Sequence, residues 1–73
     1  MAEDVRAEIV ASVLEVVVSK GDQIGAGDTV VLLESMKMEI PVLAPRRGLI
    51  RAFRAGEGDS VQEGQVLVTL EIE

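Results

Sequence analysis

Lys37 occupies the part of the sequence best suited to chemistry. It lies in the segment 34–39, Glu-Ser-Met-Lys-Met-Glu, which joins two apolar runs at 29–33 and 40–43. Two extended apolar runs that meet across so short a link are typical of a β-hairpin, and Lys37 then lies at its tip. A long, flexible lysine side chain at an exposed tip offers an amine that another enzyme could acylate without unfolding the domain.

The methionines on either side of this lysine, Met36 and Met38, admit two interpretations. Methionine often fills gaps at the edge of a hydrophobic core, and an exposed lysine is common on any protein surface. Their position favours a role in recognition instead, because apolar side chains at the point where the chain turns outward are placed to contact a partner or a cofactor ring. The residues by themselves leave both interpretations open.

The residue types that are missing argue against an enzyme. The chain contains no histidine and no cysteine, so it lacks the usual bases and nucleophiles of acyl transfer, and it has neither a disulfide nor the common zinc ligands. Several carboxylates remain, but they lie beside glycines in apparent turns, where aspartate commonly hydrogen-bonds the local backbone. These turn carboxylates are Asp22, Asp28, Asp59 and Glu63. We therefore expect a protein that does not catalyse a reaction itself.

Charge and hydropathy limit the kinds of partner that this chain could bind. The net charge of −6 and the single aromatic residue do not suit nucleic-acid binding, which requires basic and stacking side chains. One basic cluster, Arg46, Arg47, Arg51 and Arg54, forms either a basic patch or ordinary solvated strand and turn residues. Neither a long apolar run nor a charged-then-apolar leader is seen, so we expect no membrane partner and a cytoplasmic protein.

The chain consists of two copies of one unit. A shift of 37 residues aligns identical residues along most of the sequence, and conservative matches such as Val13 with Ile50 join them. The identical pairs are Gly21 and Gly58, Asp22 and Asp59, Gly27 and Gly64, Val31 and Val68, Leu33 and Leu70, and Glu34 and Glu71. Two similar units within one small domain are expected to bury their apolar faces against each other about an approximate two-fold axis.

Each unit has the pattern of an all-β structure. The expected strands are 12–18, 23–24 and 29–34 in the first unit and 49–55, 60–61 and 65–72 in the second, with glycine-containing turns between them. The alternation of apolar and polar residues along the strand breaks at the equivalent place in both units, which predicts a β-bulge in each. The fold class is therefore a flattened β-barrel or sandwich that spans residues 1–73 as a single domain.

The repeat also predicts the core and the two ends of the molecule. Apolar residues at matching places should be buried about the two-fold axis, namely Val13, Val16, Leu33, Ile50, Phe53 and Leu70. The two-fold rotation that relates the first unit to the second also relates the segment around Lys37 to the C-terminal end of the chain. Segments 5–10 and 69–72 should therefore lie together at the end of the domain opposite Lys37.

The segment around Lys37 resembles the Glu-Ala-Met-Lys-Met signature of the biotinyl domains of biotin-dependent carboxylases. The resemblance covers nearly the whole chain: the glycine and aspartate repeats match the family's turns, and Ala44, Pro45 and Gly48 match its Ala-Pro-x-x-Gly motif. Ser35 stands where the family usually has alanine, a small change at an exposed turn that modification should survive. Residues 10–12, Val-Ala-Ser, replace a turn that contains proline and glycine in many relatives.

The resemblance implies a free-standing biotin carboxyl carrier of the type without a protruding thumb. By this resemblance, a biotin protein ligase would attach biotin covalently to Lys37, and Met36, Met38, Glu34 and Ser35 would flank the attachment site. The carrier would move a carboxyl group between biotin carboxylase and carboxyltransferase subunits, itself a monomer when isolated. Two alternatives stay open. One is a lipoyl carrier domain, whose lysine usually lies between aspartate and alanine, and the other is an unmodified interaction module.

Overall fold

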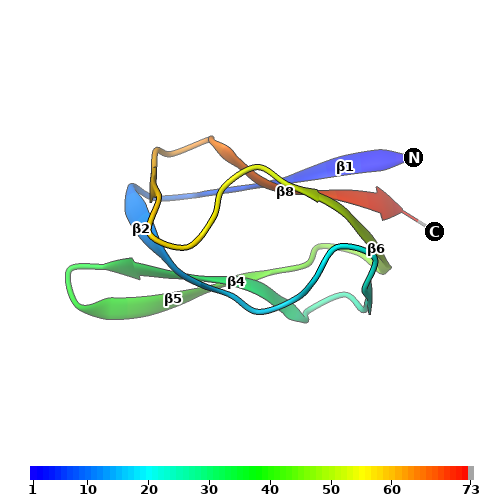
Figure 1. Ribbon diagram of the computed structural model, residues 1–73, viewed down its shortest axis with the longest axis horizontal. Coiled ribbons are helices and arrows are strands. Elements are labelled where there is room, and N and C mark those ends of the chain that lie inside the picture. The colour runs from blue at the N-terminus through cyan, green and yellow to red at the C-terminus, as the bar shows by residue number, and fades with distance from the viewer. Residues whose placement is uncertain (73) are drawn as a thin grey trace.

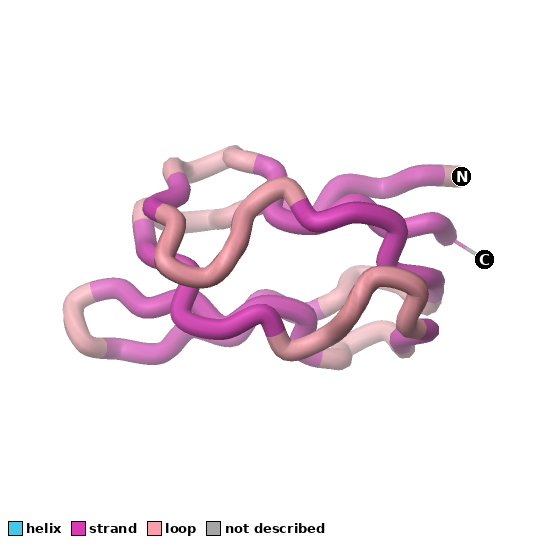
Figure 2. The backbone as a smooth tube through the Cα atoms, viewed as in Figure 1, coloured by secondary structure: helices cyan, strands magenta, loops and turns pink. Residues whose placement is uncertain are grey.

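The computed structural model describes residues 1–72, and every regular element in this range is a β-strand (Figures 1 and 2). The predicted all-β class is therefore confirmed, whereas the single-domain boundary at residue 73 lies outside the described residues. The strands are β1 (Ala2–Arg6), β2 (Ala11–Val16), β3 (Gln23–Ile24), β4 (Thr29–Ser35), β5 (Met38–Leu43), β6 (Gly48–Phe53), β7 (Ser60–Val61) and β8 (Val66–Ile72).

The strands form two four-stranded antiparallel sheets that pack face to face. The first sheet has the order β1-β8-β6-β3 and the second has the order β5-β4-β2-β7. Adding 37 to the residue numbers of β2, β3 and β4 gives β6, β7 and β8, and adding 37 to those of β1 gives the last five residues of β5. The repeat in the sequence is thus an exchange of the two sheets, which is the predicted two-fold relation.

The glycine-containing turns obey the same relation in their hydrogen bonds. The Asp22 carboxylate accepts a bond from the Ser19 N–H at 2.8 Å, and the Asp59 carboxylate accepts one from the Gly56 N–H at 2.8 Å. Gly21 and Gly58 adopt φ angles of 91° and 89°, a region that glycine enters without steric cost. These aspartates have the local structural role that their neighbourhood predicted, and so does Asp28, which accepts from the Gly25 N–H.

The predicted irregularity in each unit is a β-bulge in the structure. The register between β2 and β4 shifts between Val13 and Glu15, and that between β6 and β8 shifts between Ile50 and Ala52. The bulges lie at equivalent positions, as the common break in alternation predicted. Both β2 and β6 end two residues earlier than expected, and two further residues separate each strand from its Gly-Asp turn, which begins at Ser19 and Gly56 respectively.

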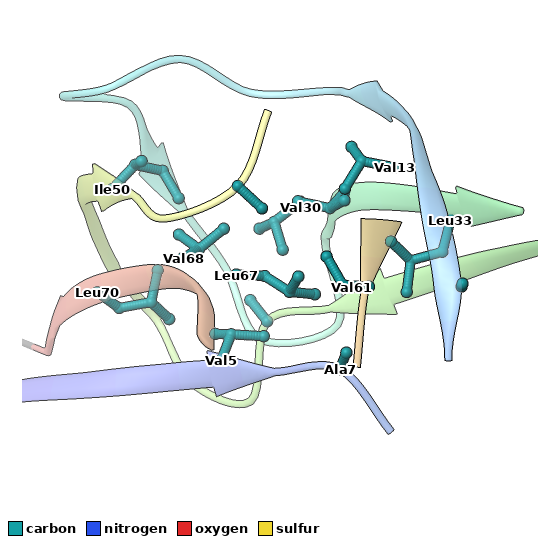
Figure 3. Close-up of a cluster of buried hydrophobic side chains, with 14 of the residues drawn as sticks. Val5, Ala7, Val13, Val30, Leu33, Ile50, Val61, Leu67, Val68 and Leu70 are labelled. Atoms are coloured by element: carbon teal, nitrogen blue, oxygen red, sulfur yellow. The ribbon is translucent and has the colours of Figure 1, made fainter. Parts of the chain in front are cut away.

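The core is aliphatic and lies between the two sheets (Figure 3). Four of the six predicted core residues are fully buried, namely Val13, Leu33, Ile50 and Leu70. Val16 and Phe53 are only partly buried, so the expectation of a central aromatic ring is wrong. Both are the last residues of their strands. Their cross-strand partners Val31 and Val68 are buried, but the side chains of Val16 and Phe53 remain partly exposed to solvent.

The sheets form a sandwich and do not close into a barrel. Within residues 1–72, strands pair only with members of their own sheet. The edge strands β1 and β5 stay apart, and a groove of about 480 Å³ between them is lined by residues of both, including Val5 and Ile40. Of the two architectures expected from the sequence, the structure selects the sandwich.

The two ends of the molecule differ as the repeat predicts. The domain measures 35 × 17 × 17 Å, and the first residues of β1 and the last residues of β8 lie at the end of the long axis opposite the β4–β5 hairpin (Figure 1). The expected N-terminal segment was wrong in its bounds, because β1 pairs with β8 from Ala2 to Arg6. Residues 7–10 instead connect β1 to β2 and so cross from one sheet to the other.

We expect Gly48→Ala to destabilise the domain. An added methyl group at Gly48 would collide with the backbone carbonyl of Glu71 on the neighbouring strand, and the backbone of a paired strand cannot move aside easily. A loss of about 1–3 kcal/mol is expected from such overpacking, measured as the free energy of unfolding in urea. Gly25→Ala is the matched control, because the nearest atom to its added methyl group is 3.6 Å away. Equal stability of the two variants would contradict the close approach at Gly48.

Candidate functional site

The β4–β5 hairpin carries Lys37 at its tip. The two strands pair from Thr29 and Leu43 to Ser35 and Met38, which leaves Met36 and Lys37 as a two-residue loop. Their φ angles are 52° and 66°, so both central residues are left-handed, as a type I′ hairpin turn requires. The predicted hairpin and the position of Lys37 at its tip are confirmed.

The loop uses residue types that do not favour its backbone conformation. Type I′ turns strongly prefer asparagine and glycine, and a left-handed residue with a side chain costs about 1–2 kcal/mol. Met36 and Lys37 are the only residues other than glycine with positive φ among residues 1–72. A strained position of this kind points to a functional demand on the side chains. The residue types at the turn do not indicate this conformation, so it could not be predicted from the sequence.

The side chains at the tip are directed into solvent. Met36 is 92% exposed and Met38 is 62% exposed, so neither fills a gap in the core. Lys37 is also exposed, and its amine makes no hydrogen bond or ion pair with any residue from 1 to 72. The amine is therefore sterically open and not engaged by the protein, which is the arrangement that acylation by another enzyme requires.

The other residues named around the lysine lie in the strands. Glu34 is exposed and faces Glu39 across the hairpin, so that two carboxylates stand directly opposite each other. Like charges in this position destabilise a sheet slightly. Ser35 is partly buried and pairs with Met38 at the end of the hairpin. Neither residue contacts Lys37 through a hydrogen bond, and their role in recognition stays a prediction.

The cluster of arginines does not form a free basic patch. Arg46 pairs with Glu3 at 3.4 Å, Arg51 pairs with Glu71 at 2.6 Å, and Arg47 is not free of interactions either. The N-terminal ammonium group, which bonds Glu71, and the Arg51 guanidinium lower the pKa of the Glu71 carboxyl below its usual value. The alternative of ordinary surface residues is thus the better description of the cluster.

Other kinds of site are not seen in the described part of the chain. Residues 1–72 contain no group of histidine, cysteine, aspartate and glutamate side chains that could hold a metal ion. They also contain no helix long and apolar enough to cross a membrane. The groove between β1 and β5 is not lined by Met36, Lys37 or Met38. The hairpin tip is consequently the feature that any functional assignment must explain.

Comparison with known proteins identifies this kind of domain. Residues 3–70 match the family described as biotin-requiring enzyme. A biotinylated protein TB7.3 homologue of Mycobacterium leprae is 64% identical over 70 residues, which cover 96% of this chain and 99% of the relative.

Solved structures agree with the family match. A single-chain, multi-domain long-chain acyl-CoA carboxylase matches 99% of this chain with a TM-score of 0.92 and 28% identity, although the match spans only 7% of the carboxylase. The lipoyl domain of the 2-oxoglutarate dehydrogenase complex from Azotobacter vinelandii matches less closely. This match covers 85% of this chain and 78% of the lipoyl-domain chain, with a TM-score of 0.72 and 27% identity. The chain therefore belongs to the biotin- and lipoyl-attachment family of the biotin-requiring enzymes, as a biotin carrier and not a catalyst.

Proposed function

We propose that biotin is joined through an amide bond to the Nζ atom of Lys37, and that the domain carries a carboxyl group between a biotin carboxylase and a carboxyltransferase. The observation that carries this proposal is the exposed Lys37 amine at a two-residue hairpin loop, which has no hydrogen-bond or ion-pair partner among residues 1–72. The attached cofactor would supply a nitrogen that accepts and releases the carboxyl group. The protein supplies reach and a high local concentration of this group at each active site.

The residues of the hairpin suit this task by geometry. The amine at the tip is held away from the body of the domain by six paired positions between β4 and β5. A paired and twisted hairpin resists bending, so the tip enters a partner's active site in a defined direction. Formation of the amide removes the positive charge of Lys37, so the arm would be neutral before it is loaded and would carry only the negative charge of the carboxyl group afterwards. The exposed Met36 and Met38 would contact the partner around the arm.

The proposal extends to the partners and the place of action. The match to a carboxylase supports carboxylase partners, and we further propose a biotin protein ligase as the enzyme that modifies Lys37. The ligase and carboxylase steps both consume ATP, which supports the cytoplasm as the compartment. We also propose that the isolated domain is a monomer, because its net charge of −6 opposes self-association.

The lipoyl alternative is supported by the likeness of the fold to a lipoyl domain. The more similar carboxylase structure and the methionines on both sides of Lys37 favour biotin. Intact mass spectrometry after co-expression with biotin ligase or lipoate ligase separates the possibilities. We expect the mass of one biotin amide. A lipoyl amide alone would overturn the proposal, and no added mass with either ligase would favour an unmodified interaction module.

We expect Met36→Leu and Met38→Leu to preserve the fold while they lower the rate of biotinylation. Both side chains are exposed, so folding loses no packing, whereas a branched side chain presents a different surface to the ligase. The rate of biotin transfer and the free energy of unfolding are measured on the same samples. If either substitution lowered stability by about 2 kcal/mol or more without altering transfer, a role in packing would replace the role in recognition.

A further inference from the structure

The two sheets expose outer faces that can be compared position by position, because the repeat superimposes one on the other. On the second sheet, Glu15 pairs with Leu32 and Leu32 pairs with Pro41, so these three side chains share the outer face. On the first sheet, the row at the equivalent positions is Ala52, Thr69 and Asp4. Each outer face thus has the same backbone framework and a different set of side chains.

The outer face of the first sheet is a polar network. The Thr69 hydroxyl donates to Asp4 at 3.0 Å, and the Arg54 Nε–H donates to that hydroxyl at 3.3 Å. Arg6 lies 3.7 Å from the Asp4 carboxylate and also donates to the carbonyl of Gly64. Arg51, at the bulge, pairs with Glu71. Charged and hydroxyl side chains therefore occupy these positions without harm to the fold.

Around Glu15, the outer face of the second sheet is apolar at positions that are polar on the first sheet. Leu14, Val17 and Leu43 are 40%, 49% and 50% exposed, Pro41 is exposed, and Leu32 is partly buried between them. The equivalent positions on the first sheet hold Arg51, Arg54, Arg6, Asp4 and Thr69, in the same order. Since the fold accepts polar residues here, it does not explain the apolar ones. We call these five residues, Leu14, Val17, Leu32, Pro41 and Leu43, the apolar face.

Carboxylates without partners border the apolar face on the side of the hairpin tip. Glu34 and Glu39, which pair in the next row toward Lys37, form this border, and Glu15 lies on the same outer face within the row of Leu32 and Pro41. None of the three makes an ion pair within residues 1–72, in contrast to Glu71, which is the equivalent of Glu34 on the first sheet. This border suits a partner whose apolar surface is rimmed by lysine and arginine. A second copy related by two-fold symmetry would instead bring like carboxylates together.

We propose that the apolar face docks the carrier onto the biotin carboxylase subunit, through a surface of that subunit with an apolar centre and a basic rim. The face lies on the sheet that extends into the Lys37 hairpin, so docking would orient the arm toward the active site. An exposed apolar patch with a polar border is a common mark of a protein interface. This inference rests on the proposed attachment of biotin to Lys37.

The two-fold relation supplies both the test variant and its control. In Leu14→Arg/Val17→Arg, the second sheet receives the residues that the first sheet already carries at the equivalent positions. Arg51→Leu/Arg54→Val makes the reciprocal change on the opposite face. Both variants and the wild type are biotinylated, checked by intact mass, and used as substrates for the biotin carboxylase subunit of the same organism. Release of ADP in the presence of bicarbonate is measured against carrier concentration.

We expect the test variant to raise the KM of the carboxylase for the carrier by about tenfold or more, with kcat little changed, because several exposed contacts are lost and positive charge meets the basic rim. The control variant should match the wild type. Activity with free biotin verifies the carboxylase preparation.

Any other pattern overturns the docking proposal. Unchanged KM in the test variant, or an equal rise in the control variant, would show that the apolar face does not bind the carboxylase. A defect confined to the biotinylation step would assign the face to the ligase. Self-association of the wild type, measured by sedimentation and lost in the test variant, would assign it to a second copy. Absence of biotin from the wild type would instead refute the proposed function itself, so the two failures are distinguishable.

Discussion

Lys37→Arg is expected to abolish biotinylation completely. Arginine keeps the positive charge and a long side chain, but its guanidinium stays protonated and does not act as the acceptor amine. The backbone at this position is left-handed, and arginine meets the same steric demand there as lysine does. The fold and the hairpin should therefore persist. Intact mass and streptavidin binding after reaction with biotin, ATP and ligase measure the outcome.

Lys20→Arg is the matched control for this experiment, since Lys20 is the other lysine of the chain and precedes Gly21 in the Gly-Asp turn of the first unit. It lacks flanking methionines, and its replacement should leave the incorporation of one biotin unchanged. Retention of biotin by the Lys37 variant, together with its loss from the Lys20 variant, would transfer the attachment site to Lys20. Biotin on both variants would show that neither lysine is the sole acceptor.

Leu70→Ala is expected to have the largest effect on stability, a loss of about 2–5 kcal/mol in the free energy of unfolding. Leu70 is fully buried between the two sheets, where the loss of its side chain leaves a cavity (Figure 3). In a domain of this size such a loss is a large part of the total stability. Urea unfolding at low temperature, followed by circular dichroism, measures the change.

Phe53→Ala supplies the comparison, because it removes more atoms from a position that is only partly buried. We expect it to cost less than Leu70→Ala despite the larger side chain, since much of the space it leaves is open to solvent. Leu70→Val serves as the milder substitution if the alanine variant does not fold, with an expected loss of about 1 kcal/mol. A greater loss from Phe53→Ala than from Leu70→Ala would restore the aromatic ring to the centre of the core.

The strands were predictable where local pattern and packing agree. A polar residue followed by an apolar one comes directly after each Gly-Asp turn. This pattern predicted the bounds of β3 and β7 without error. The prediction of Phe53 as a core residue failed because the pattern places it on the inward face but does not reveal that its strand ends there. Periodicity identifies the face on which a residue lies, whereas its burial depends on how far the opposite sheet extends over it.

At the candidate site, too, some features were predictable from the local sequence and others depend on how the strands pair. Position within the repeat and the flanking methionines were enough to select Lys37 and to place it at a hairpin tip. The left-handed backbone of Met36 and Lys37 was not predictable, because their residue types disfavour it and only the pairing of Ser35 with Met38 requires it. Likewise, the carboxylates Glu34 and Glu39 are five residues apart in sequence and meet only through the strand register.

The sequence by itself determined that this chain has two equivalent all-β units, an aliphatic core and one lysine at their junction. These features depend on periodicity and on residue type, which are local properties. The tertiary structure decided that the sheets form an open sandwich and that one outer face is a polar network while the other is apolar. The physical reason is that both outcomes depend on distances between strands remote in the chain. Leu32 and Thr69 are equivalent in the repeat, yet the Thr69 hydroxyl hydrogen-bonds to Asp4 on the neighbouring strand, whereas Leu32 lies between Glu15 and Pro41 with an apolar side chain at the surface.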